Sequence, residues 1–234
     1  MGIKVILQAR MTSSRLPGKF SMLLNDKPMI ERQILRIKKS NKISSICVAT
    51  STHQSDNPIV KICESLGVEI YRGSLDNVFS RFAEVVDASN DEDIVRLTAD
   101  CPLFSSDLLE EMLSYYWNSN LEYYSNTILR TYPRGLDIEI FKADLIRRLN
   151  KTELSASEKE HVTVAIHSRP DTFRIGNHAQ EIDLSLHRWT VDTEKDYDFM
   201  KWLYTNFVGR EELFNQKDIL KLLINFPSKI NLEI

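Results

Sequence analysis

The sequence predicts an α/β fold with a doubly wound, mainly parallel sheet, and two observations support this prediction. Residues 1–118 contain four short apolar segments that are typical of buried strands. Each of these segments is followed by one that carries apolar residues at helical spacing. Strand–helix units that repeat in this way form right-handed crossovers, which place helices on both faces of a parallel sheet. No repeat or linker divides the chain, so we expect a single domain over residues 1–234.

The first half of the chain supplies these four units in order. The predicted strands are residues 3–8, 46–50, 68–71 and 94–98, and the helices that follow them are residues 29–37, 58–66, 78–86 and 108–116. The second helix has the clearest boundaries, because Asn57 and Pro58 suit an N-cap and a first turn, and Gly67 suits a C-terminal end.

The second half of the chain is less regular. Strands are predicted at residues 122–127, 136–141, 173–177 and 188–191, and helices at residues 143–149, 157–167, 195–208 and 216–225. A turn at residues 132–135 joins the first two of these strands, and Ser-x-x-Glu capping boxes introduce the helix near residue 157. Residues 122–178 are expected to form a small β-arm that protrudes from the domain.

Composition excludes several classes of protein. The 30 basic and 33 acidic residues give a net charge of −3, so no global positive field favours a nucleic acid. No apolar run approaches the roughly 20 residues that span a bilayer, and the N-terminus lacks the pattern of a signal peptide. The three cysteines form no CxxC pair, so we expect buried thiols in a cytoplasmic protein. Neither a membrane nor a nucleic acid is an expected partner.

Phosphate-binding chemistry follows the first predicted strand, although the seven glycines form neither a GxGxxG pattern nor a Walker P-loop. Doubly wound sheets bind ligands beyond the carboxyl ends of their strands. The loop there combines three cations, three hydroxyl groups and a run of backbone N–H groups, which suit a triphosphate. A solvated basic loop is the alternative. The candidate nucleotide-binding residues of this loop are Gln8, Ala9, Arg10, Ser13, Ser14, Arg15 and Lys19.

Two aspartates follow predicted strands and are candidate metal ligands. Asp100 comes after the strand at 94–98, and Asp192 comes after the strand at 188–191. A carboxylate from each could hold one Mg²⁺ ion, with water and phosphate oxygens as the remaining ligands. The alternative role is to cap the following helices, but Ser105 lies nearer to one helix, and Thr193 with Asp196 can cap the other.

Six stretches of the sequence, at residues 6–19, 72–81, 96–102, 133–139, 158–163 and 188–192, carry a family resemblance. In these stretches the chain resembles the cytidylyltransferases that make CMP-activated acidic sugars, which have the nucleotide-diphospho-sugar transferase fold. It is most similar to the spore coat polysaccharide biosynthesis protein F group, relatives of CMP-3-deoxy-manno-octulosonate and CMP-sialate synthetases. The resemblance implies a homodimer that moves CMP from CTP to an acidic sugar or related acceptor, with release of pyrophosphate, for surface polysaccharide biosynthesis.

The resemblance also implies roles for individual residues. It makes Arg10, Lys19, Asp100 and Asp192 catalytic, and it makes the two aspartates ligands of Mg²⁺. Its implied nucleoside contacts are Arg72, Ser74 and Asn77, its implied acceptor contacts are Arg134, Asp137 and Glu139, and its implied phosphate contacts are Arg10, Ser13, Ser14, Arg15 and Lys19. His161 could contact substrate across a dimer interface, or it could lie on a helix surface.

Three other functions remain possible at this point. The chain could be a nucleotidyltransferase that uses another NTP or a phosphorylated non-sugar acceptor. It could be a glycosyltransferase, but the Asp91-Glu92-Asp93 run precedes a predicted strand, whereas the metal motif of that class follows one. It could also be a nucleotide-binding regulator without turnover, which the presence of both strand-end aspartates argues against.

Overall fold

The computed structural model describes residues 3–13 and 15–233. Within these residues, seven strands form one sheet in the order β5-β4-β1-β6-β8-β7-β9. Of the described strands in this sheet, only β8 runs antiparallel to its neighbours, so the predicted doubly wound, mainly parallel fold is confirmed. The strands are β1 (Ile3–Gln8), β4 (Ile43–Ser51), β5 (Glu69–Gly73), β6 (Asp93–Thr98), β7 (Tyr123–Ser125), β8 (Glu139–Lys142) and β9 (Ile175–Asn177).

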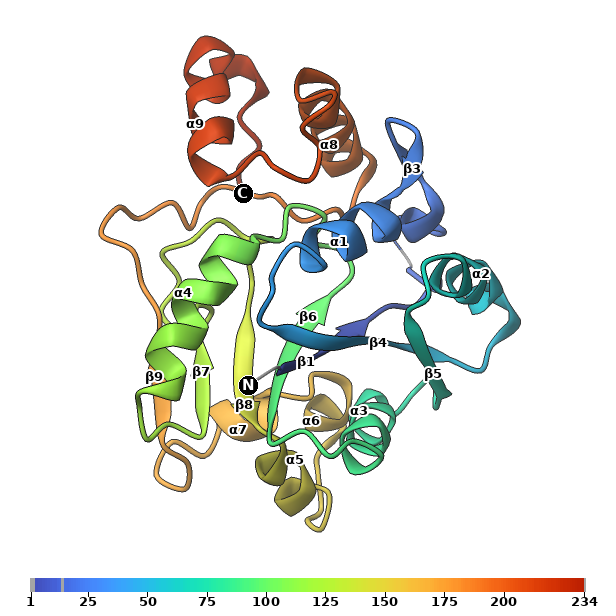
Figure 1. The fold of residues 1–234 in the computed structure, drawn as a ribbon, viewed down its shortest axis with the longest axis vertical. Helices are drawn as coiled ribbons and strands as arrows, with labels where there is room; N and C mark the ends of the chain where they lie inside the picture. Colours follow the sequence, from blue (N-terminus) through green and yellow to red (C-terminus); the bar gives the residue numbers. More distant parts are fainter. Residues whose placement is uncertain (1–2, 14, 234) are drawn as a thin grey trace.

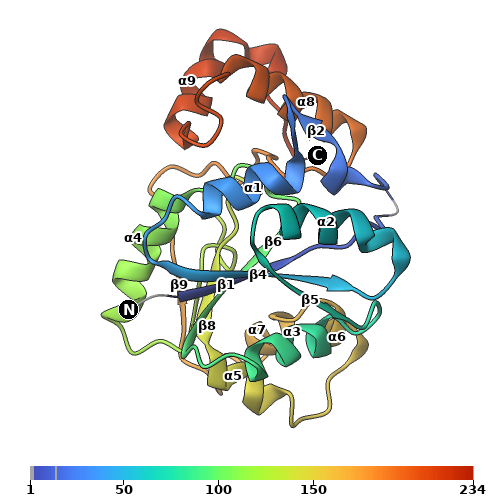
Figure 2. The same cartoon turned by 45° about the vertical axis from the view of Figure 1, so that its right-hand side comes forward.

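Helices cover both faces of this sheet (Figure 2). One face carries α1 (Met29–Ile37), α2 (Asn57–Ser65) and α4 (Ser106–Trp117), and the other carries α3 (Val78–Asp87), α5 (Ala143–Leu149), α6 (Ala156–Glu160) and α7 (Val164–His167). Successive side chains of a strand point to opposite faces of the sheet. In β1, Val5 and Leu7 therefore belong to the hydrophobic core beneath α1, whereas Ile6 belongs to the core beneath α3.

A further layer lies beyond α1 and contains the C-terminal helices (Figure 1). It consists of α8 (Glu194–Asn206), α9 (Gln216–Asn225) and a hairpin of β2 (Leu23–Leu24) with β3 (Lys27–Pro28). The buried guanidinium of Arg36 attaches this layer to α1, because it donates hydrogen bonds to the backbone carbonyls of Phe104, Glu211 and Phe214. Among the described residues there are also short 3₁₀ helices, namely η1 (Lys19–Ser21), η2 (Gln54–Asp56) and η3 (Pro227–Lys229).

The β-arm predicted at residues 122–178 does not protrude. Its strands β7, β8 and β9 instead extend the main sheet beside β6. The physical reason is that their side chains are apolar on both faces. Tyr124 and Ile140 pack in the core beneath α1, whereas Tyr123 and Phe141 pack in the core beneath α3. An arm in solvent would expose at least one of these faces, so burial within the sheet is favoured.

The helix predicted at residues 157–167 is interrupted. α6 ends at Glu160, His161 has non-helical dihedral angles, and α7 begins at Val164. Val162 and Thr163 between the two helices are buried, so this part of the chain enters the core beneath α3. The expected capping box is present, since the Ser155 hydroxyl accepts from the Glu158 amide and the Glu158 carboxylate accepts from the Ser155 amide.

Two smaller predictions are also wrong. Residues 188–191 form no strand within the described part of the chain, because the amides of Trp189 and Val191 donate to different segments, at the carbonyls of Arg134 and Asp100. Asn57 lies in the first turn of α2, and the residue that precedes this helix is Asp56. The carboxylate of Asp56 makes other contacts, which are described with the site below.

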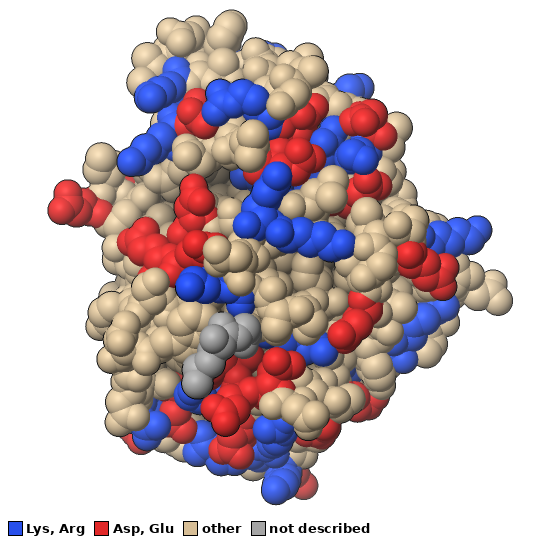
Figure 3. Space-filling model, in the orientation of Figure 1, with Lys and Arg blue, Asp and Glu red and all other residues tan. Residues whose placement is uncertain are grey.

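The distribution of charged side chains on the surface and the state of the cysteines agree with what the composition predicts. On the face seen in Figure 3, acidic and basic side chains are interspersed. No helix in the described ranges is both long enough and apolar enough to cross a membrane. Cys47, Cys63 and Cys101 are buried and unpaired, as the sequence predicts. Burial raises the pKa of Cys47 to about 11 and that of Cys63 to about 12, so neither thiol is a nucleophile at neutral pH.

Candidate active site

The strand order places a crevice at the carboxyl ends of β1 and β6. From β1 the chain continues to β4 on one side, and it later returns to β6 on the other side. Such a switch point is where a doubly wound sheet binds its ligands. A cavity of about 380 Å³ lies there. The sequence-predicted residues that line it are Gln8, Ala9, Arg10, Ser13, Arg15, Lys19, Asp100, His161 and Asp192.

The loop after β1 is held in shape by its own backbone and by one buried carboxylate. The amides of Ser13 and Gly18 both donate to the carbonyl of Met11. Gly18 has a φ of +74°, a conformation that glycine adopts without strain, and it places Lys19 at the start of η1. Ser14, predicted to bind nucleotide, lies outside the described residues.

Asp56 is the carboxylate that fixes this loop. One oxygen accepts from the Met11 amide at 2.7 Å, and the other accepts from the Thr50 hydroxyl and from the amide and hydroxyl of Ser51. Burial alone would raise the pKa of Asp56, but these hydrogen bonds lower it below its ordinary value. Asp56 was not a predicted site residue, because nothing in the local sequence around it indicates a contact with the loop after β1.

Lys19 brings the two predicted metal ligands together. Its ammonium group lies 3.0 Å from Asp192 Oδ1 and 3.7 Å from Asp100 Oδ2, and it donates to the Val191 carbonyl at 2.8 Å. The Lys19 side chain is only 6% exposed, so this positive charge has little access to solvent. Two carboxylates that are 92 positions apart in the chain therefore converge on one point beside the cationic loop.

Asp192 is fixed by a second set of contacts. The guanidinium groups of Arg15 and Arg188 lie 3.1 and 2.7 Å from its two oxygens. Its backbone is held as well, because the Asp192 amide donates to Asp196 in the capping box that opens α8. The predicted pairing of Thr193 with Asp196 is confirmed, and it leaves the Asp192 carboxylate facing the cavity.

A buried polar chain supports the floor of the cavity. Gln8 of β1 accepts a hydrogen bond from Arg96 of β6, and Arg96 forms an ion pair with Glu139 of β8. Tyr123 donates to the other oxygen of Glu139 at 2.5 Å. Burial opposes ionisation of Glu139, but Arg96 and these hydrogen bonds lower its pKa below the ordinary value. Glu139, implied to bind the acceptor, does not line the cavity but holds Arg96, which does.

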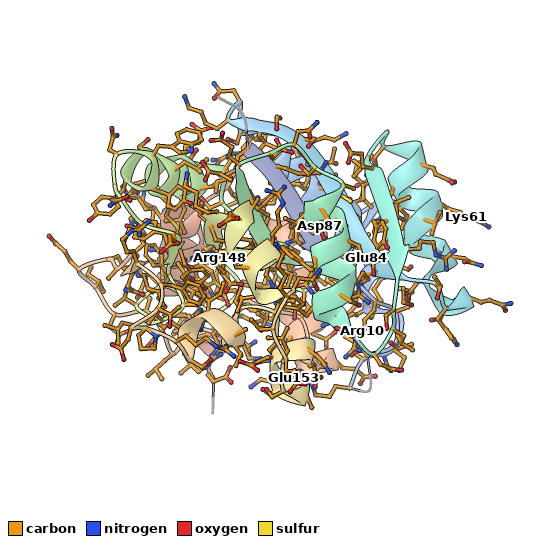
Figure 4. The ribbon with its side chains drawn as sticks, turned by 90° about the horizontal axis from the view of Figure 1, so that it is seen from below. Arg10, Lys61, Glu84, Asp87, Arg148 and Glu153 are labelled. Carbon is orange, nitrogen blue, oxygen red and sulfur yellow. The ribbon has the colours of Figure 1, made fainter. Side chains whose placement is uncertain are left out.

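The N-terminal end of α3 forms the opposite wall, where Arg10 and Arg81 lie. Figure 4 shows Arg10 beside this end of the helix. Arg81 is only 2% exposed, one of its terminal nitrogens donates to the Ser74 carbonyl, and its Nε has no partner among the described residues. Burial and the nearby Arg10 lower the pKa of Arg81. The negative charge of Asp56 opposes this lowering of the Arg81 pKa. The oxygens of Asp56 already accept hydrogen bonds from the loop after β1 and from β4.

The remaining predicted residues lie away from the cavity lining. Arg72 donates to the carbonyls of Ser51 and His53, and Asn77 caps α3 by accepting from the Ser80 amide. Ser74, through its hydroxyl, accepts from the Asn77 amide, Arg134 lies near Glu233, and Asp137 pairs with Arg130. The structure thus brings together the loop, the two aspartates and His161, but it gives these other side chains structural partners.

Three α-helical residues that line the cavity were not predicted, and one of them is Val78 at the start of α3. Arg81 belongs to the apolar face of α3, and Glu160 precedes His161 at the end of α6. His161 is exposed at the rim of the cavity. Arg81 could have been found from the sequence, because it lies between Phe79 and Phe82 on an apolar helix face. A charged residue that is buried at such a position is expected to have a polar partner.

A doubly wound sheet with a cationic loop and two carboxylates at its switch point defines the class of nucleotidyltransferases. The chain belongs to the cytidylyltransferase family, because the family model described as Cytidylyltransferase matches residues 4–223. It is 28% identical to the spore coat polysaccharide biosynthesis protein SpsF of Bacillus subtilis over 232 residues, which are 96% of this chain and 95% of that protein.

Solved structures give the same assignment of fold. A cytidylyltransferase from Leptospira borgpetersenii superposes with a TM-score of 0.93 at 30% identity, covering 100% of this chain and 98% of that one. A CMP:2-keto-3-deoxy-manno-octonic acid synthetase, solved in complex with CTP, gives a TM-score of 0.68 at 17% identity and covers 88% of this chain and 99% of that one. The second similarity shows a shared fold.

Proposed function

We propose that this protein transfers CMP from CTP to an acidic sugar, with release of pyrophosphate. The observation that carries the proposal is the convergence of Asp100 and Asp192 on the ammonium group of Lys19, beside the loop after β1. Charged groups of both signs are thereby fixed where a phosphoryl centre would react. Such transfers depend mainly on positioning and on charge neutralisation.

The two aspartates fit a magnesium ion. Carboxylate oxygens are preferred ligands of Mg²⁺, which usually keeps only one or two of them and completes its shell with water and phosphate. No group of three or more His, Cys, Asp or Glu side chains that could hold a metal ion occurs in the part of the chain that is described. Two carboxylates next to a phosphate-binding loop match this sparse protein contribution. When bound there, Mg²⁺ would supply Lewis-acid neutralisation of charge at the α-phosphate.

The side chains of the loop have distinct tasks in this proposal. Arg10 and the backbone amides of the loop bind the triphosphate, since fixed donors hold anions without a Walker sequence. Arg15 and Lys19 supply positive charge where pyrophosphate departs. Arg188, which is ion-paired with Asp192, keeps that carboxylate oriented toward the cavity.

The acceptor class and the biological setting rest on the relatives. The similarity to a spore coat polysaccharide biosynthesis protein supports a role in making surface polysaccharide. The homodimer that the family resemblance implies is also part of this proposal. Sedimentation velocity tests this last point, and a monomer at micromolar concentration would contradict it.

One assay tests the proposed reaction. The protein is incubated with Mg²⁺, each of the four NTPs in turn and a panel of acidic sugars, while pyrophosphate release and product mass are followed. We expect release with CTP and a product whose mass equals the acceptor plus CMP less water. Release with another NTP would favour a different nucleotidyltransferase. Binding of CTP without release, over the whole acceptor panel, would favour a regulator.

A further inference from the structure

The backbone of residues 231–233 pairs with that of residues 186–188, shortly before Asp192. The amides of Arg188 and Glu233 each donate a hydrogen bond of 2.8 Å to a carbonyl of the other segment. An antiparallel bridge lies between these two hydrogen bonds. A segment that is distant from Asp192 in the chain is thereby fixed beside the residues that lead to it.

The side chain of Asn231 connects this pairing to the helix that follows Asp192. It is 3% exposed, and its amide nitrogen donates to the Arg188 carbonyl at 3.1 Å and to Asp196 Oδ1 at 2.9 Å. Asp196 closes the capping box of α8, and its other oxygen accepts from the Asp192 amide at 3.0 Å. A buried amide group requires partners, and these partners hold the backbone before and at Asp192.

The guanidinium group of Arg188 contacts three carboxylates, each through a different nitrogen. Nη2 donates to Asp192 Oδ2 at 2.7 Å, and Nε donates to Asp196 Oδ1 at 3.1 Å. Nη1 donates to Oε2 of Glu233, and the same oxygen lies 3.6 Å from Nε of Arg134. Because Asp196 and Glu233 occupy Nε and Nη1, Arg188 holds the candidate metal ligand through Nη2 alone.

This single contact leaves the second oxygen of Asp192 to the cavity. Oδ1 lies 3.0 Å from the Lys19 ammonium group and 3.1 Å from the Arg15 guanidinium group. A guanidinium group that has two free nitrogens tends to bind both oxygens of a carboxylate as a fork. Without Glu233, Arg188 would be free to turn Nη1 toward Asp192 and to take both of its oxygens, in competition with a metal ion.

We propose that Glu233 is a positioning residue for the divalent ion, because it holds Nη1 of Arg188 away from Asp192 and so keeps Asp192 Oδ1 available as a ligand. The proposal rests on the proposed Mg²⁺-dependent transfer. It adds to that site a residue that does not itself line the cavity. Asn231 supports the arrangement by fixing the backbone from which both charged side chains extend.

Electron paramagnetic resonance of Mn²⁺ added to the nucleotide-free full chain tests the proposal without turnover. Glu233→Ala should lower Mn²⁺ affinity by about 10-fold, as loss of a residue that orients a metal ligand typically does. Glu233→Gln keeps an acceptor for Nη1 and loses only a charge that Arg188 separates from the ion. It should therefore lower the affinity by about threefold or less.

Pyrophosphate release gives a second readout. The Mg²⁺ concentration that gives half-maximal rate should rise about 10-fold in Glu233→Ala, whereas kcat at saturating Mg²⁺ should stay within about twofold. The reason is that excess ion displaces the guanidinium group from Asp192. Partly exposed ion pairs contribute little to stability, so the melting temperature should fall by less than about 4 °C.

Glu212→Ala is the matched control. Arg32 is likewise surrounded by three carboxylates, those of Asp26, Glu211 and Glu212, and Glu212 is partly exposed, as Glu233 is. Among the described residues, Arg32 neither lines the cavity nor pairs with a candidate metal ligand. The control should leave Mn²⁺ affinity unchanged.

Three outcomes would overturn the inference. Mn²⁺ affinity that is unchanged in Glu233→Ala, or Mn²⁺ binding that is absent in the wild-type protein, would show that Glu233 does not position the ion. An equal loss of affinity in Glu233→Gln and Glu233→Ala would show that charge matters and the direction of Arg188 does not. Failure of the proposed function is distinguishable, because Mn²⁺ affinity would still depend on Glu233 while no NTP gave pyrophosphate release.

Discussion

The two ends of the cavity differ in how their charges are satisfied. At the metal end, defined by Lys19, Asp100 and Asp192, the cation and the carboxylates already contact one another. At the α3 end, Arg10 and Arg81 form no ion pair with a carboxylate of any described residue. The difference separates two tasks. Charged groups at the metal end are held by one another beforehand, whereas the two arginines at the α3 end keep N–H donors with which a bound ligand could pair.

The largest expected effect is at the metal end. Asp192→Asn and Asp100→Asn should each lower kcat by about 10²–10³-fold, as loss of a preorganised charged group typically does. CMP affinity should change by less than about threefold, because the loop after β1 and the arginines at the α3 end are left intact. Pyrophosphate release and calorimetry measure the two quantities. Asp198→Asn, an exposed acid on α8, is the control. A loss of CMP binding as large as the loss of kcat would mean that the two ends are not separate.

Replacing Lys19 tests whether its ammonium group competes with a divalent ion. Lys19→Met should lower kcat by about 10²-fold or more, because the charge beside the departing pyrophosphate is lost. It should also raise the Mn²⁺ affinity of the nucleotide-free protein by about 10-fold, since roughly one unit of repulsive charge within about 4 Å is removed. Electron paramagnetic resonance of added Mn²⁺ measures this affinity. Unchanged or weaker Mn²⁺ binding would show that Lys19 and the ion do not share the carboxylates.

Replacing Asp56 tests how the loop after β1, which lies between the two ends of the cavity, is held in place. Asp56→Asn should lower the free energy of unfolding by about 2 kcal/mol, because the amide nitrogen replaces an oxygen that accepts buried hydrogen bonds. Urea denaturation at neutral pH measures this loss. An unchanged stability there would contradict the assigned role of Asp56.

The same residue gives a pH dependence with a defined sign. The pKa of Asp56 in the folded protein is lowered from its ordinary 3.8. The unfolded chain therefore binds this proton more readily, and the stabilisation is fully present above about pH 4. It is lost as the pH falls below 3.8 through the folded pKa. The stability difference between wild type and Asp56→Asn should shrink over that acid range, and a constant difference would refute the assignment.

The smallest expected effect concerns α6, which carries Glu160 to the rim of the cavity. Ser155→Ala removes one half of the capping box and should cost about 1 kcal/mol of stability. For a chain of this size the melting temperature should fall by about 2–4 °C. Calorimetry measures the shift, and kcat should stay within about twofold. A large loss of kcat would show that α6 contributes more to the reacting end than its exposed position suggests.

Regular patterns explain what the sequence could predict. Strands such as β1 and helices such as α9 have apolar periodicity that local residues determine, so their bounds agree closely with the structure. The loop after β1 and Asp100 follow predicted strands, and a parallel sheet brings strand ends to one edge. These parts of the site could therefore be found from position alone.

Long-range contacts explain what could not be predicted. Residues 188–191 have the composition of a strand, but their amides bond to two separate segments, and only the folded chain determines that choice. Asp56 contacts the Met11 amide, which is 45 positions away in the chain and follows a different strand. Arg81 contacts the Ser74 carbonyl, which is 7 positions away. Arg72 and Asn77 were assigned by resemblance, although their side chains satisfy nearby backbone groups. No local pattern distinguishes such a structural polar residue from a binding one.

The contacts of Lys19 have a practical consequence for handling the protein. Because the lysine itself balances Asp100 and Asp192, the fold does not depend on a bound ion to relieve their repulsion. Treatment with a chelator such as EDTA should therefore stop turnover and leave the melting temperature unchanged. Activity should return in full when the divalent ion is added back. This result is expected for a reversibly bound catalytic ion and not for a structural metal ion on which folding depends.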